Sequence, residues 1–532
     1  MEDSDAEIVM ESYRKHFFLT ESKLKELVSD FSKSLELGLS EKVSKERNSA
    51  NKNENLFTRK HQLIPLKMLD SCVNKLPKGN ETGIYYSIDM GGTNLRCIRI
   101  ELREDGKNST RYKKTKLNDL KIKNVDEKNE MTVLDNKVTS EEMFDEIATF
   151  FGKFLVECGD MPKNEKNCNS TNFSKNAFDI TFTFSFPTEQ VEVGKANLIT
   201  WTKGIETGRS TFLPVEGRDV GELLNSAFSR KNIPAHCKYI INDTIGTLIS
   251  AIYDSNCTNF RNITDNKTNI QIKSSDELED NTCTIPRENG LKRLKIGTEN
   301  KNPCVGVVIG TGLNSCYIEP NSEQYGYKGL IINTECGDFY SSNLPITDCD
   351  LTLDWNSDNR GEQLFEKMIS GNYLGEICRL LFIKSLKDAT PKVFFKSNSV
   401  STENISNIIR LFENSQNGNF SELVSYLQNT FSCELSPNSE RIIAELSLFV
   451  LNRAAQLVSV MISALFKRLE SHNSSGISVA IDGSIWTKNP IFRRIVRESL
   501  CTILGDNANE LVQVFVSDDG SGKGAAVLAA VI

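Results

Sequence analysis

The chain is poor in histidine and has no closely spaced pair of cysteines. Only 4 of its 532 residues are histidines, and none lies beside a glycine-rich turn or in a G-x-S-x-G motif, which argues against Ser-His-Asp or Cys-His catalysis. The 14 cysteines are scattered and never form C-x-x-C, so neither a zinc site nor a disulfide framework is indicated. We therefore expect a carboxylate to perform any proton transfer.

The chain also lacks an excess of positive charge and an N-terminal leader pattern. With 63 lysines and arginines against 71 aspartates and glutamates, the formal net charge is -8, which argues against nucleic acid as a partner. The opening MEDSDAEIVMESYRKHFF is acidic and has no long apolar run, so we expect no signal peptide and no membrane anchor. Hydrophobic residues at 39% and charged residues at 25% are typical of a soluble protein, and we expect a cytoplasmic enzyme.

The order of predicted elements indicates an α/β protein of two or more lobes, because the length exceeds the usual domain of about 100 to 200 residues. An amphipathic helix with Thr20 as its N-cap is predicted over 17–40. Further helices are predicted over 141–157, 244–254, 361–383 and 440–470. Strands that end in polar or glycine-rich turns are predicted over 84–89, 95–102, 179–186, 237–242, 304–310, 315–319 and 477–482.

Several stretches are polar and carry little apolar periodicity. Residues 255–302 are rich in Asn, Thr, Asp, Lys and Ser, and we interpret them as a flexible surface insertion. The shorter tracts 103–130, 159–177 and 397–419 look similar, although each could contain a short hairpin or helix.

Two strands run into glycine turns of a related kind. In YYSIDMGGTNLRC, residues 85–97, the pair Gly91-Gly92 permits a tight turn whose amides could approach an anion, yet an ordinary hairpin turn is about equally consistent. The stretch VGVVIGTGLNSCYIE repeats the pattern with Gly310-Thr311-Gly312. Two such hairpins could hold a polyphosphate between them.

Two later stretches, VAIDGSIWTK and VSDDGSGKGAAVLAA, add further turns in which a strand meets Asp-Gly. The second contains Gly-Ser-Gly-Lys, which suggests a P-loop. That motif fails here, because Ser517 stands where the first P-loop glycine is required and Gly524 follows Lys523 where Ser or Thr must bind magnesium.

Candidate polar residues follow other strand ends. In FTFSFPTEQ, Ser185 lies two residues before a proline, and such a sequence is more often the plain end of a strand than a functional site. Lys203 in WTKG would, taken alone, be a solvated surface lysine. In YIINDTIGTLIS an apolar strand meets Asn242-Asp243-Thr244 and then a helix. Asp243 is either the N-cap of that helix or a carboxylate that accepts a substrate proton.

Nine segments of the sequence together carry a specific resemblance. They are LPKGNETGIYYSIDMGGTNLR, FTFSFPT, WTKG, INDTIGT, IGTGLNSCYIE, INTECGDF, GEQLFEKMISGNYLGE, IDGS and DDGSGKGAA. In this order they resemble a eukaryotic hexokinase of the sugar kinase, heat-shock ATPase and actin superfamily, from about residue 17 onward. The resemblance implies an α/β, two-lobed actin-like ATPase (ribonuclease H-like) fold with an active-site cleft between a small and a large domain.

The resemblance also implies domain boundaries and site residues. The large domain would comprise 17–79 and 243–520, the small domain 80–242, and a C-terminal helix over 521–532 would return to the small domain. The hexose would be surrounded by Ser185, Phe186, Thr202, Lys203, Asn242, Asp243, Asn314, Glu335, Gln363 and Glu366. Catalysis would rest on Asp243 as the base, with Lys203.

The resemblance assigns a further set of residues to the nucleotide. The phosphates of MgATP would be faced by Asp89, Gly91, Gly92, Thr93, Asn94, Arg96 and Thr311, with Asp89 reaching Mg2+ through water. The adenosine end would be held by Gly371, Asn372, Ser484 to Lys488, Gly520, Ser521 and Gly522. Cys336 and Asp338 depart from the family pattern, which has an aromatic and a small residue there.

The activity so implied is transfer of the γ-phosphoryl group of ATP to the 6-hydroxyl of glucose and related hexoses, the first step of glycolysis, by a monomer or homodimer. One alternative is a catalytically weak sugar sensor or scaffold of the same fold, and Asp243, Lys203 and both glycine turns argue against it. Another is an ATPase of the superfamily without a sugar substrate, and FTFSFPT, WTKG and Glu366 argue against that.

Overall fold

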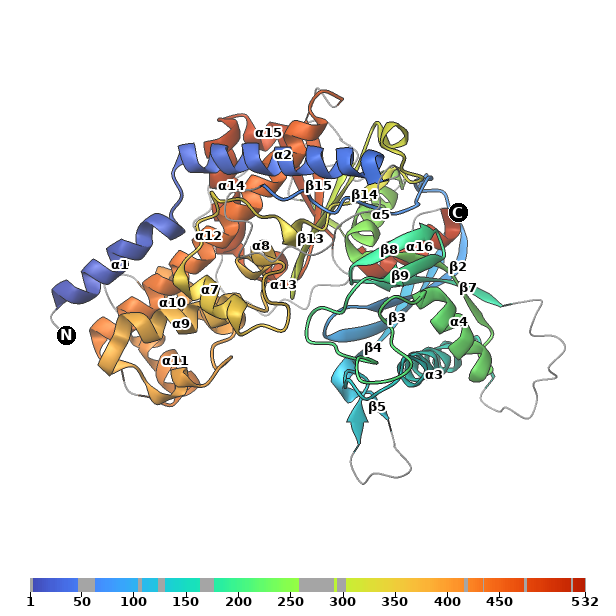
Figure 1. Ribbon diagram of the computed structural model, residues 1–532, viewed down its shortest axis with the longest axis horizontal. Helices are drawn as coiled ribbons and strands as arrows, with labels where there is room; N and C mark the ends of the chain where they lie inside the picture. The colour runs from blue at the N-terminus through green and yellow to red at the C-terminus, as the bar shows by residue number, and fades with distance from the viewer. Residues whose placement is uncertain are drawn as a thin grey trace, which may run out of the picture.

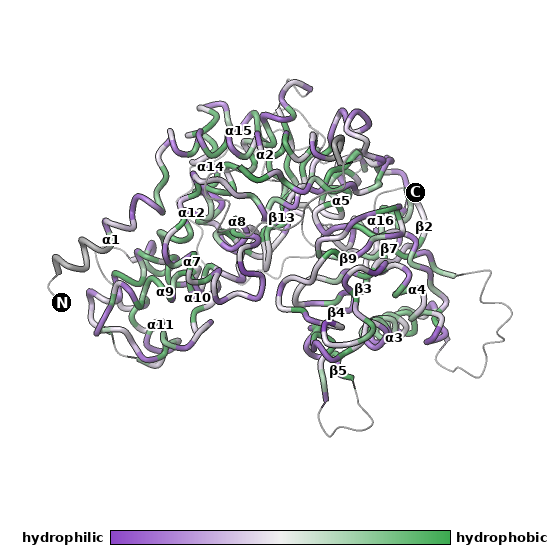
Figure 2. The backbone as a smooth tube through the Cα atoms, viewed as in Figure 1, coloured by the Kyte–Doolittle hydropathy of each residue, from purple (hydrophilic) through white to green (hydrophobic). Residues whose placement is uncertain are grey.

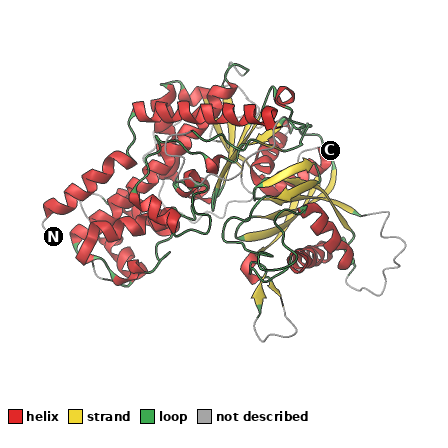
Figure 3. Ribbon diagram, in the orientation of Figure 1, coloured by secondary structure: helices red, strands yellow, loops and turns green. Residues whose placement is uncertain are grey.

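The structure is a computed structural model, and it describes residues 3–45, 63–103, 108–122, 130–162, 177–257, 291–293, 303–415, 420–433, 435–472, 476–517 and 520–531. Two β-sheets lie in different parts of the molecule, and most helices surround the larger sheet (Figure 1; Figure 3). Hydrophobic segments run through the interior of each part, while many connecting loops are hydrophilic (Figure 2).

The smaller sheet has the strand order β10-β7-β2-β3-β4. Its strands are β2 (Gly83–Met90), β3 (Asn94–Leu102), β4 (Ser109–Lys116), β7 (Phe178–Phe184) and β10 (Ala235–Ile241). The strands β10, β7 and β2 are parallel, and β2, β3 and β4 form an antiparallel meander.

The larger sheet has the order β1-β14-β13-β12-β15-β16-β11. Its strands are β1 (Leu69–Asp70), β11 (Leu291–Arg293), β12 (Val305–Ile309), β13 (Leu313–Ile318), β14 (Ile331–Asn333), β15 (Ile477–Asp482) and β16 (Val512–Ser517). Here β12, β15 and β16 are parallel, and β12, β13 and β14 are antiparallel.

The two sheets therefore share one topology. The strands β10-β7-β2-β3 of one correspond to β16-β15-β12-β13 of the other, in the same order and with the same directions. In each sheet a glycine turn closes the central antiparallel hairpin, at residues 91–93 and 310–312. Because the carboxyl ends of parallel strands meet at one edge, polar residues after β7, β10, β15 and β16 are expected at the site edge of their sheets.

Two helices fill the space between the sheets. Helix α5 (Asp243–Asn256) packs against β12 and β13, helix α16 (Gly520–Val531) packs against β2, β3 and β7, and the two helices pack closely on each other (Figure 1). The hydroxyl of Ser87 in β2 donates to the carbonyl oxygen of Gly522 at 2.7 Å, although the two residues are 435 positions apart. The C-terminal helix thus covers one face of the smaller sheet.

The remaining helices cover the outer faces. The smaller sheet is covered by α3 (Ser140–Cys158) and α4 (Val220–Arg230), and two small hairpins flank it, β5 (Lys121–Ile122) with β6 (Met131–Thr132) and β8 (Thr188–Glu192) with β9 (Lys195–Leu198). The helices on the side of the larger sheet are α1 (Asp3–Phe17), α2 (Glu21–Lys45), α7 (Asp348–Trp355), α8 (Leu364–Lys367), α9 (Leu374–Leu386), α10 (Thr402–Asn414), α11 (Ser421–Phe431), α12 (Pro437–Leu469), α13 (Ser484–Lys488), α14 (Pro490–Leu504) and α15 (Ala508–Leu511).

Helix α12 is the core of the helical part. Within the described ranges it is the one helix long and apolar enough to cross a membrane, and 94% of its most hydrophobic window is buried inside the molecule. Its Arg453 makes a two-pronged ion pair with Asp350 of α7, with both N–O distances at 2.7 Å, and the side chains are 0% and 2% exposed. A buried pair of this kind costs several kcal/mol to break, because the remaining charge is left without a partner.

The structure confirms one predicted helix and divides another. The helix over 17–40 is confirmed as α2, which starts at Glu21, and the unpredicted helix α1 ends before it, where the backbone N–H of Leu19 donates to the side chain of Gln456 in α12 at 2.9 Å. Thr20 is confirmed as the cap of α2, since its hydroxyl accepts the N–H of Lys23 at 3.3 Å. The helix over 361–383 is divided into α8 and α9, because the N–H groups of Gly371 and Asn372 bind the carbonyls of Gly310 and Thr311 instead of the preceding turn.

Some polar tracts contain elements that composition did not reveal. Strand β4 lies in 103–130 and helix α10 in 397–419, so these tracts include the short elements that were left open. Most of 255–302 and of 159–177 lies outside the described residues. Within 255–302, which we interpret as a flexible surface insertion, the described residues 291–293 form β11, which pairs with β16 at the edge of the larger sheet.

Candidate active site

A pocket lies where the strand ends of both sheets meet. It is lined by Ser185, Phe186, Pro187, Thr202, Lys203, Asn242, Asp243, Val308, Gly312, Leu313, Asn314, Glu335, Gln363 and Glu366. All ten residues that the resemblance assigned to the hexose line this one pocket. Pro187, Val308, Gly312 and Leu313 were not predicted, although each directly neighbours a quoted motif residue.

Three of the pocket residues have unusual backbone angles. Lys203, Glu335 and Gln363 have φ of 63°, 51° and 52°, in the left-handed region that non-glycine residues seldom occupy. Such conformations cost about 1 to 3 kcal/mol each and persist where surrounding contacts fix them. Because three such residues line one pocket, we infer that surrounding contacts fix the directions of their side chains despite the unfavourable backbone conformation.

Amide and carboxylate groups form a connected network along one wall. The amide nitrogen of Asn314 donates to Asn333 at 2.9 Å and to Asn242 and Glu335 at 3.3 Å. Asn333 in turn donates to Glu335 at 2.8 Å. Asn333 was not among the predicted site residues, although it stands in the quoted segment INTECGDF, and its contribution is to orient Asn314 and Glu335.

Lys203 provides the positive charge of the pocket. Its ammonium group donates to the carbonyl oxygen of Ser185 at 2.6 Å and lies 5.3 Å from the ring centroid of Phe186. Its charge acts on the carboxyl groups of Asp243, Glu335 and Glu366, where it lowers each pKa against the effect of burial. The solvated-lysine alternative for Lys203 is therefore wrong.

Asp243 occupies the first turn of α5. The N-cap is Asn242, whose side-chain oxygen accepts the backbone N–H of Thr244. The alternative in which Asp243 serves as the cap is therefore wrong, and its carboxylate lines the pocket. Burial raises the pKa of the Asp243 carboxyl, the charge of Asp89 raises it further, and the Lys203 ammonium lowers it.

Glu366 projects from α8 into the same space. Its carboxylate accepts the backbone N–H of Leu313 at 2.8 Å. Burial raises the pKa of Glu366 to about 7, Lys203 works against this, and Glu335 adds to it. A carboxyl group that accepts or donates hydrogen bonds at neutral pH is suited to bind a hydroxyl group.

Both glycine turns approach pocket residues closely. A Cβ on Gly92 would lie 2.7 Å from Cδ of Lys203, and a Cβ on Gly312 would lie 2.7 Å from the Glu366 carboxylate. Side chains at these two positions would displace the lysine or the glutamate. The turn at 91–93 closes the β2-β3 hairpin and also lies at the pocket, so the hairpin and the anion-binding interpretations are compatible.

Asp89 lies at the end of β2 beneath the first turn. Its carboxylate accepts from Nε of Arg96 at 3.1 Å and from the hydroxyl of Ser521 at 2.9 Å, and Arg96 also contacts Ser521 at 2.9 Å. These contacts unite three of the residues predicted for the phosphate and nucleotide side. Among the described residues no cluster of three or more His, Cys, Asp or Glu could enclose a metal, so a divalent cation here would need water and phosphate ligands, as Mg2+ prefers.

Three of the residues predicted for the adenosine end, Gly371, Asn372 and Ser484, lie around the second turn. Gly371 and Asn372 bind the backbone of residues 310 and 311, as described above, and Ser484 begins α13 directly after the β15 strand end. Asp482, which was not predicted, accepts the N–H groups of Gly483 at 2.6 Å and Gly520 at 3.1 Å. Asp482 thereby links the turn in IDGS to the turn in DDGSGKG.

Two predicted or suggestive residues lie further away. Lys488 is exposed at the far end of α13. Lys523 binds both carboxylate oxygens of Asp254 in α5, at 2.5 and 2.6 Å, about three helical turns from Asp243. The structure therefore gives Lys523 a partner within the helix pair.

Two sheets of one topology, two helices between them and a polar pocket at their strand ends define the class of two-lobed, actin-like ATPase folds. Two family models, each described as hexokinase, match residues 9–253 and 304–531. The chain therefore belongs to the hexokinase family, enzymes that phosphorylate hexoses with ATP.

Individual relatives agree over nearly the whole chain. A hexokinase of Plasmodium falciparum is 35% identical over 512 residues, 96% of this chain and 89% of the relative. One of Toxoplasma gondii is 32% identical over 464 residues, 87% of this chain and 86% of the relative. Among solved structures, a hexokinase crystal structure matches with a TM-score of 0.75 at 30% identity and covers 99% of both chains. A Schistosoma mansoni hexokinase in complex with glucose matches with a TM-score of 0.73 at 26% identity and covers 100% of both.

Proposed function

We propose that this enzyme transfers the γ-phosphoryl group of MgATP to the 6-hydroxyl of glucose and related hexoses, with Asp243 as the base. The observation that carries the proposal is the placement of Asp243, which lies in the pocket between both glycine turns without being needed as a helix cap. A carboxylate within hydrogen-bond reach of a hydroxyl can orient it and accept its proton as the bond to phosphorus forms.

The pocket supports a sugar as the acceptor. Carboxylates and carboxamides dominate its wall, and a hexose presents hydroxyl groups all round that these groups can bind. The hydroxyl of Thr202 is buried without a hydrogen-bond partner in the described structure, so a sugar hydroxyl would satisfy it. The glucose named for the Schistosoma mansoni relative agrees with this chemistry.

The phosphate side follows from the turns. The N–H groups of residues 92–94 and the exposed Thr311 would face the phosphates, with Arg96 balancing their charge, while the N–H of Gly91 donates to the carbonyl oxygen of Asn94 within the turn. Mg2+, when bound with the nucleotide, would neutralise the transferred phosphoryl group, and Asp89 would hold it through water. Lys203 stabilises the charge that develops on the phosphoryl oxygens near Asp243.

Two features of the enzyme in solution belong to the same proposal. Residues 80–242 act as the small domain and residues 17–79 with 243–520 as the large domain, and the two domains close on the sugar, which excludes water from the phosphoryl group. The enzyme is cytoplasmic and works as a monomer or homodimer. Sedimentation of the purified chain with and without glucose would test the last point.

One experiment tests the proposal directly. We expect ADP to form from MgATP with glucose, mannose or fructose, and the product to carry phosphate on C6 by 13C and 31P NMR. The analogue 6-deoxyglucose should bind and compete with glucose but should not be phosphorylated. ADP formation that is equal with and without sugar would favour a simple ATPase, and sugar binding without any turnover would favour a sensor.

A further inference from the structure

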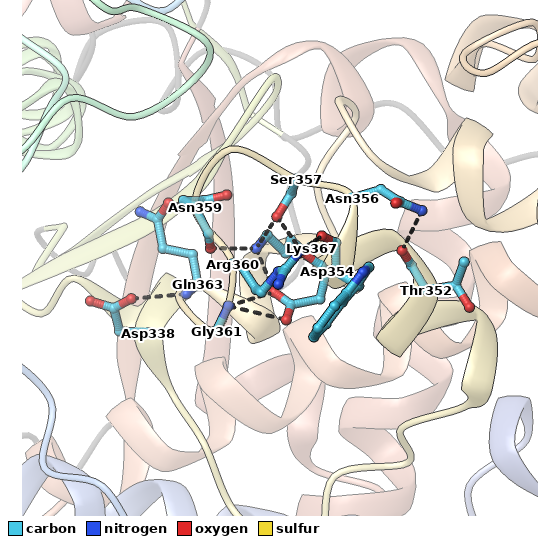
Figure 4. A network of polar contacts seen from close by, with 11 residues as sticks. Asp338, Thr352, Asp354, Asn356, Ser357, Asn359, Arg360, Gly361, Gln363 and Lys367 are labelled. Atoms are coloured by element: carbon cyan, nitrogen blue, oxygen red, sulfur yellow. Dashed lines mark hydrogen bonds and ion pairs between the residues drawn. The ribbon is translucent and has the colours of Figure 1, made fainter. Parts of the chain in front are cut away.

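Asp338 lies behind the pocket wall and joins two separate segments. One carboxylate oxygen accepts the backbone N–H of Gln363 at 3.1 Å (Figure 4), and the other binds the ammonium group of Lys67 at 2.6 Å. Neither Lys67 nor Asp338 is part of the pocket lining. Asp338 also stands where the family pattern has a small residue, so this contact is a departure that the resemblance does not explain.

The contact fixes the backbone of Gln363. This residue has φ of 52° and starts the short helix α8, so the direction of its side chain depends on what restrains its N–H group. Its side-chain oxygen accepts from Asn359 at 2.8 Å. The Gln363 amide is thus fixed at its backbone by Asp338 and at its end by the preceding loop (Figure 4).

The other end of that loop is fixed by a buried lysine. The ammonium group of Lys367 donates to Asp354 at 2.7 Å, to Ser357 at 2.9 Å and to the carbonyl of Asn359 at 2.8 Å (Figure 4). Asp338 adds to this loop a contact from a different segment, at the backbone N–H of Gln363.

Lys67 supplies the charge for this side of the site. It precedes β1, which pairs with β14, and that pairing places Leu69 opposite Asn333 next to Glu335. Burial and the charge of Asp338 raise the pKa of the Glu335 carboxyl, and the charges of Lys67 and Lys203 lower it. The carboxyl groups of Glu335 and Glu366 also interact with each other. Lys67 is therefore the counter-charge on the outer side of the pocket, and Lys203 is the one on the phosphate side.

We propose that Lys67 and Asp338 are positioning residues for the hexose, which hold Gln363 and Glu335 in their sugar-binding geometry without touching the sugar. The inference rests on the proposed function, because it takes a hexose as the occupant of the pocket. It assigns the pair to sugar affinity and not to phosphoryl transfer, since the groups that the pair contacts or acts on are Gln363, Glu335 and Glu366, and not Asp243 or Asp89.

The test compares Asp338→Ala, Asp338→Asn and Lys67→Met with the parent and with Lys25→Met, which breaks an exposed 2.6 Å pair with Glu21 on α2. Asp338→Ala should raise the glucose KM and the glucose Kd measured calorimetrically without nucleotide by about 3- to 10-fold, as expected for one lost hydrogen bond. The kcat and the KM for MgATP should change less than about twofold. Asp338→Asn keeps an acceptor for Gln363 and should have a smaller effect than Asp338→Ala.

Lys67→Met adds a readout that a loss of packing would not change. Without the Lys67 charge the Glu335 carboxyl is harder to ionise, so the acid limb of kcat/KM for glucose should move to higher pH, while Lys25→Met should leave it in place. Unfolding midpoints verify that each variant is folded, and Asp338→Asn with Lys67→Met decides the matter if Asp338→Ala does not fold. Glucose Kd values within twofold of the parent and an unmoved acid limb would overturn the inference. A parent that binds glucose without phosphorylating it would contradict the proposed function alone.

Discussion

Asn242 caps helix α5 through Thr244, whose backbone N–H and hydroxyl donate to the Asn242 side-chain oxygen at 3.0 and 2.7 Å. Asp243 stands between these two residues and takes no part in the cap. Helix α5 starts directly after β10. Because Asn242 already accepts a backbone N–H at the start of this helix, the carboxylate of Asp243 is left to face the pocket.

Replacing Asp243 by Asn should consequently lower kcat without weakening the helix. We expect kcat to fall about 10²- to 10⁴-fold, the range for a positioned acid or base, with a smaller change in glucose Kd. Stability should be equal or higher, because the fold raises the pKa of this carboxyl and so disfavours its charged form. Steady-state kinetics and urea unfolding check both parts, with the exposed Asp179→Asn as control. A near-normal kcat in Asp243→Asn would show that another group takes the proton.

Lys523→Ala should leave the chemistry nearly intact. Its ammonium group is held by Asp254 and not by the turns, so we expect kcat within about twofold and a modest change in the KM for MgATP. Stability should fall by about 1 to 3 kcal/mol because Asp254 loses its partner, and Lys523→Ala combined with Asp254→Ala should recover part of the loss. A large loss of kcat would place Lys523 at the triphosphate after all.

Glu366 should give sugar binding and stability a pH dependence near neutrality. Its pKa is raised to about 7 in the fold, so its contribution to stability is present at low pH and is lost as the pH rises from about 4.5 through 7. Glu366→Gln should therefore be more stable than the parent at pH 8, by about 1 to 3 kcal/mol, with no such gain at pH 4.5. Glucose Kd of the parent should change between pH 6 and 8, and that step should be absent in the variant. Parallel pH curves for the two proteins would count against this role.

The buried pair of Arg453 and Asp350 should be the most sensitive polar contact of the helical part. We expect Arg453→Met to cost about 3 to 5 kcal/mol, because Asp350 is left charged and buried. Adding Asp350→Asn should restore part of this. Arg494→Met, which breaks an exposed pair with Glu413, should cost no more than about 1 kcal/mol. Urea unfolding would measure all four proteins, and equal losses for Arg453→Met and Arg494→Met would refute the distinction.

The strands and long helices could be predicted from sequence because their signals are local. Apolar runs ending in glycine or Asp-Gly turns marked β2, β12 and β15, and a helical period marked α3, α5 and α12. The break between α8 and α9 could not be predicted in this way, since the residues that interrupt the helix bind a turn some 60 positions earlier in the chain. Strand β4 was missed for a similar reason, because a polar edge strand such as STRYKKTK has no apolar periodicity.

The resemblance of the motifs, taken in their order, predicted which residues line the pocket. It did not predict how these residues contact one another. Nothing in the local sequence distinguishes Asn242 from Asp243 as the cap, or indicates that Lys203, Glu335 and Gln363 adopt positive φ. Lys67, Asn333 and Asp482 were missed because they act through other residues, and such a role depends on pairings between distant segments, such as β1 with β14.

Because α16 is synthesised last, the smaller sheet is covered only when synthesis of the chain is almost complete. The face of the smaller sheet that includes Ser87 is completed by residues 520–531, and the contact partner of Ser87 is made 435 positions later. At a synthesis rate of about 5 to 20 residues per second, that face waits roughly 20 to 90 s for its covering helix. During this interval Ile100 and Leu102 of β3 lack the apolar residues of α16 that bury them. We therefore expect the nascent N-terminal half to bind chaperones, and we expect a chain truncated before α16 to leave this face of the sheet uncovered.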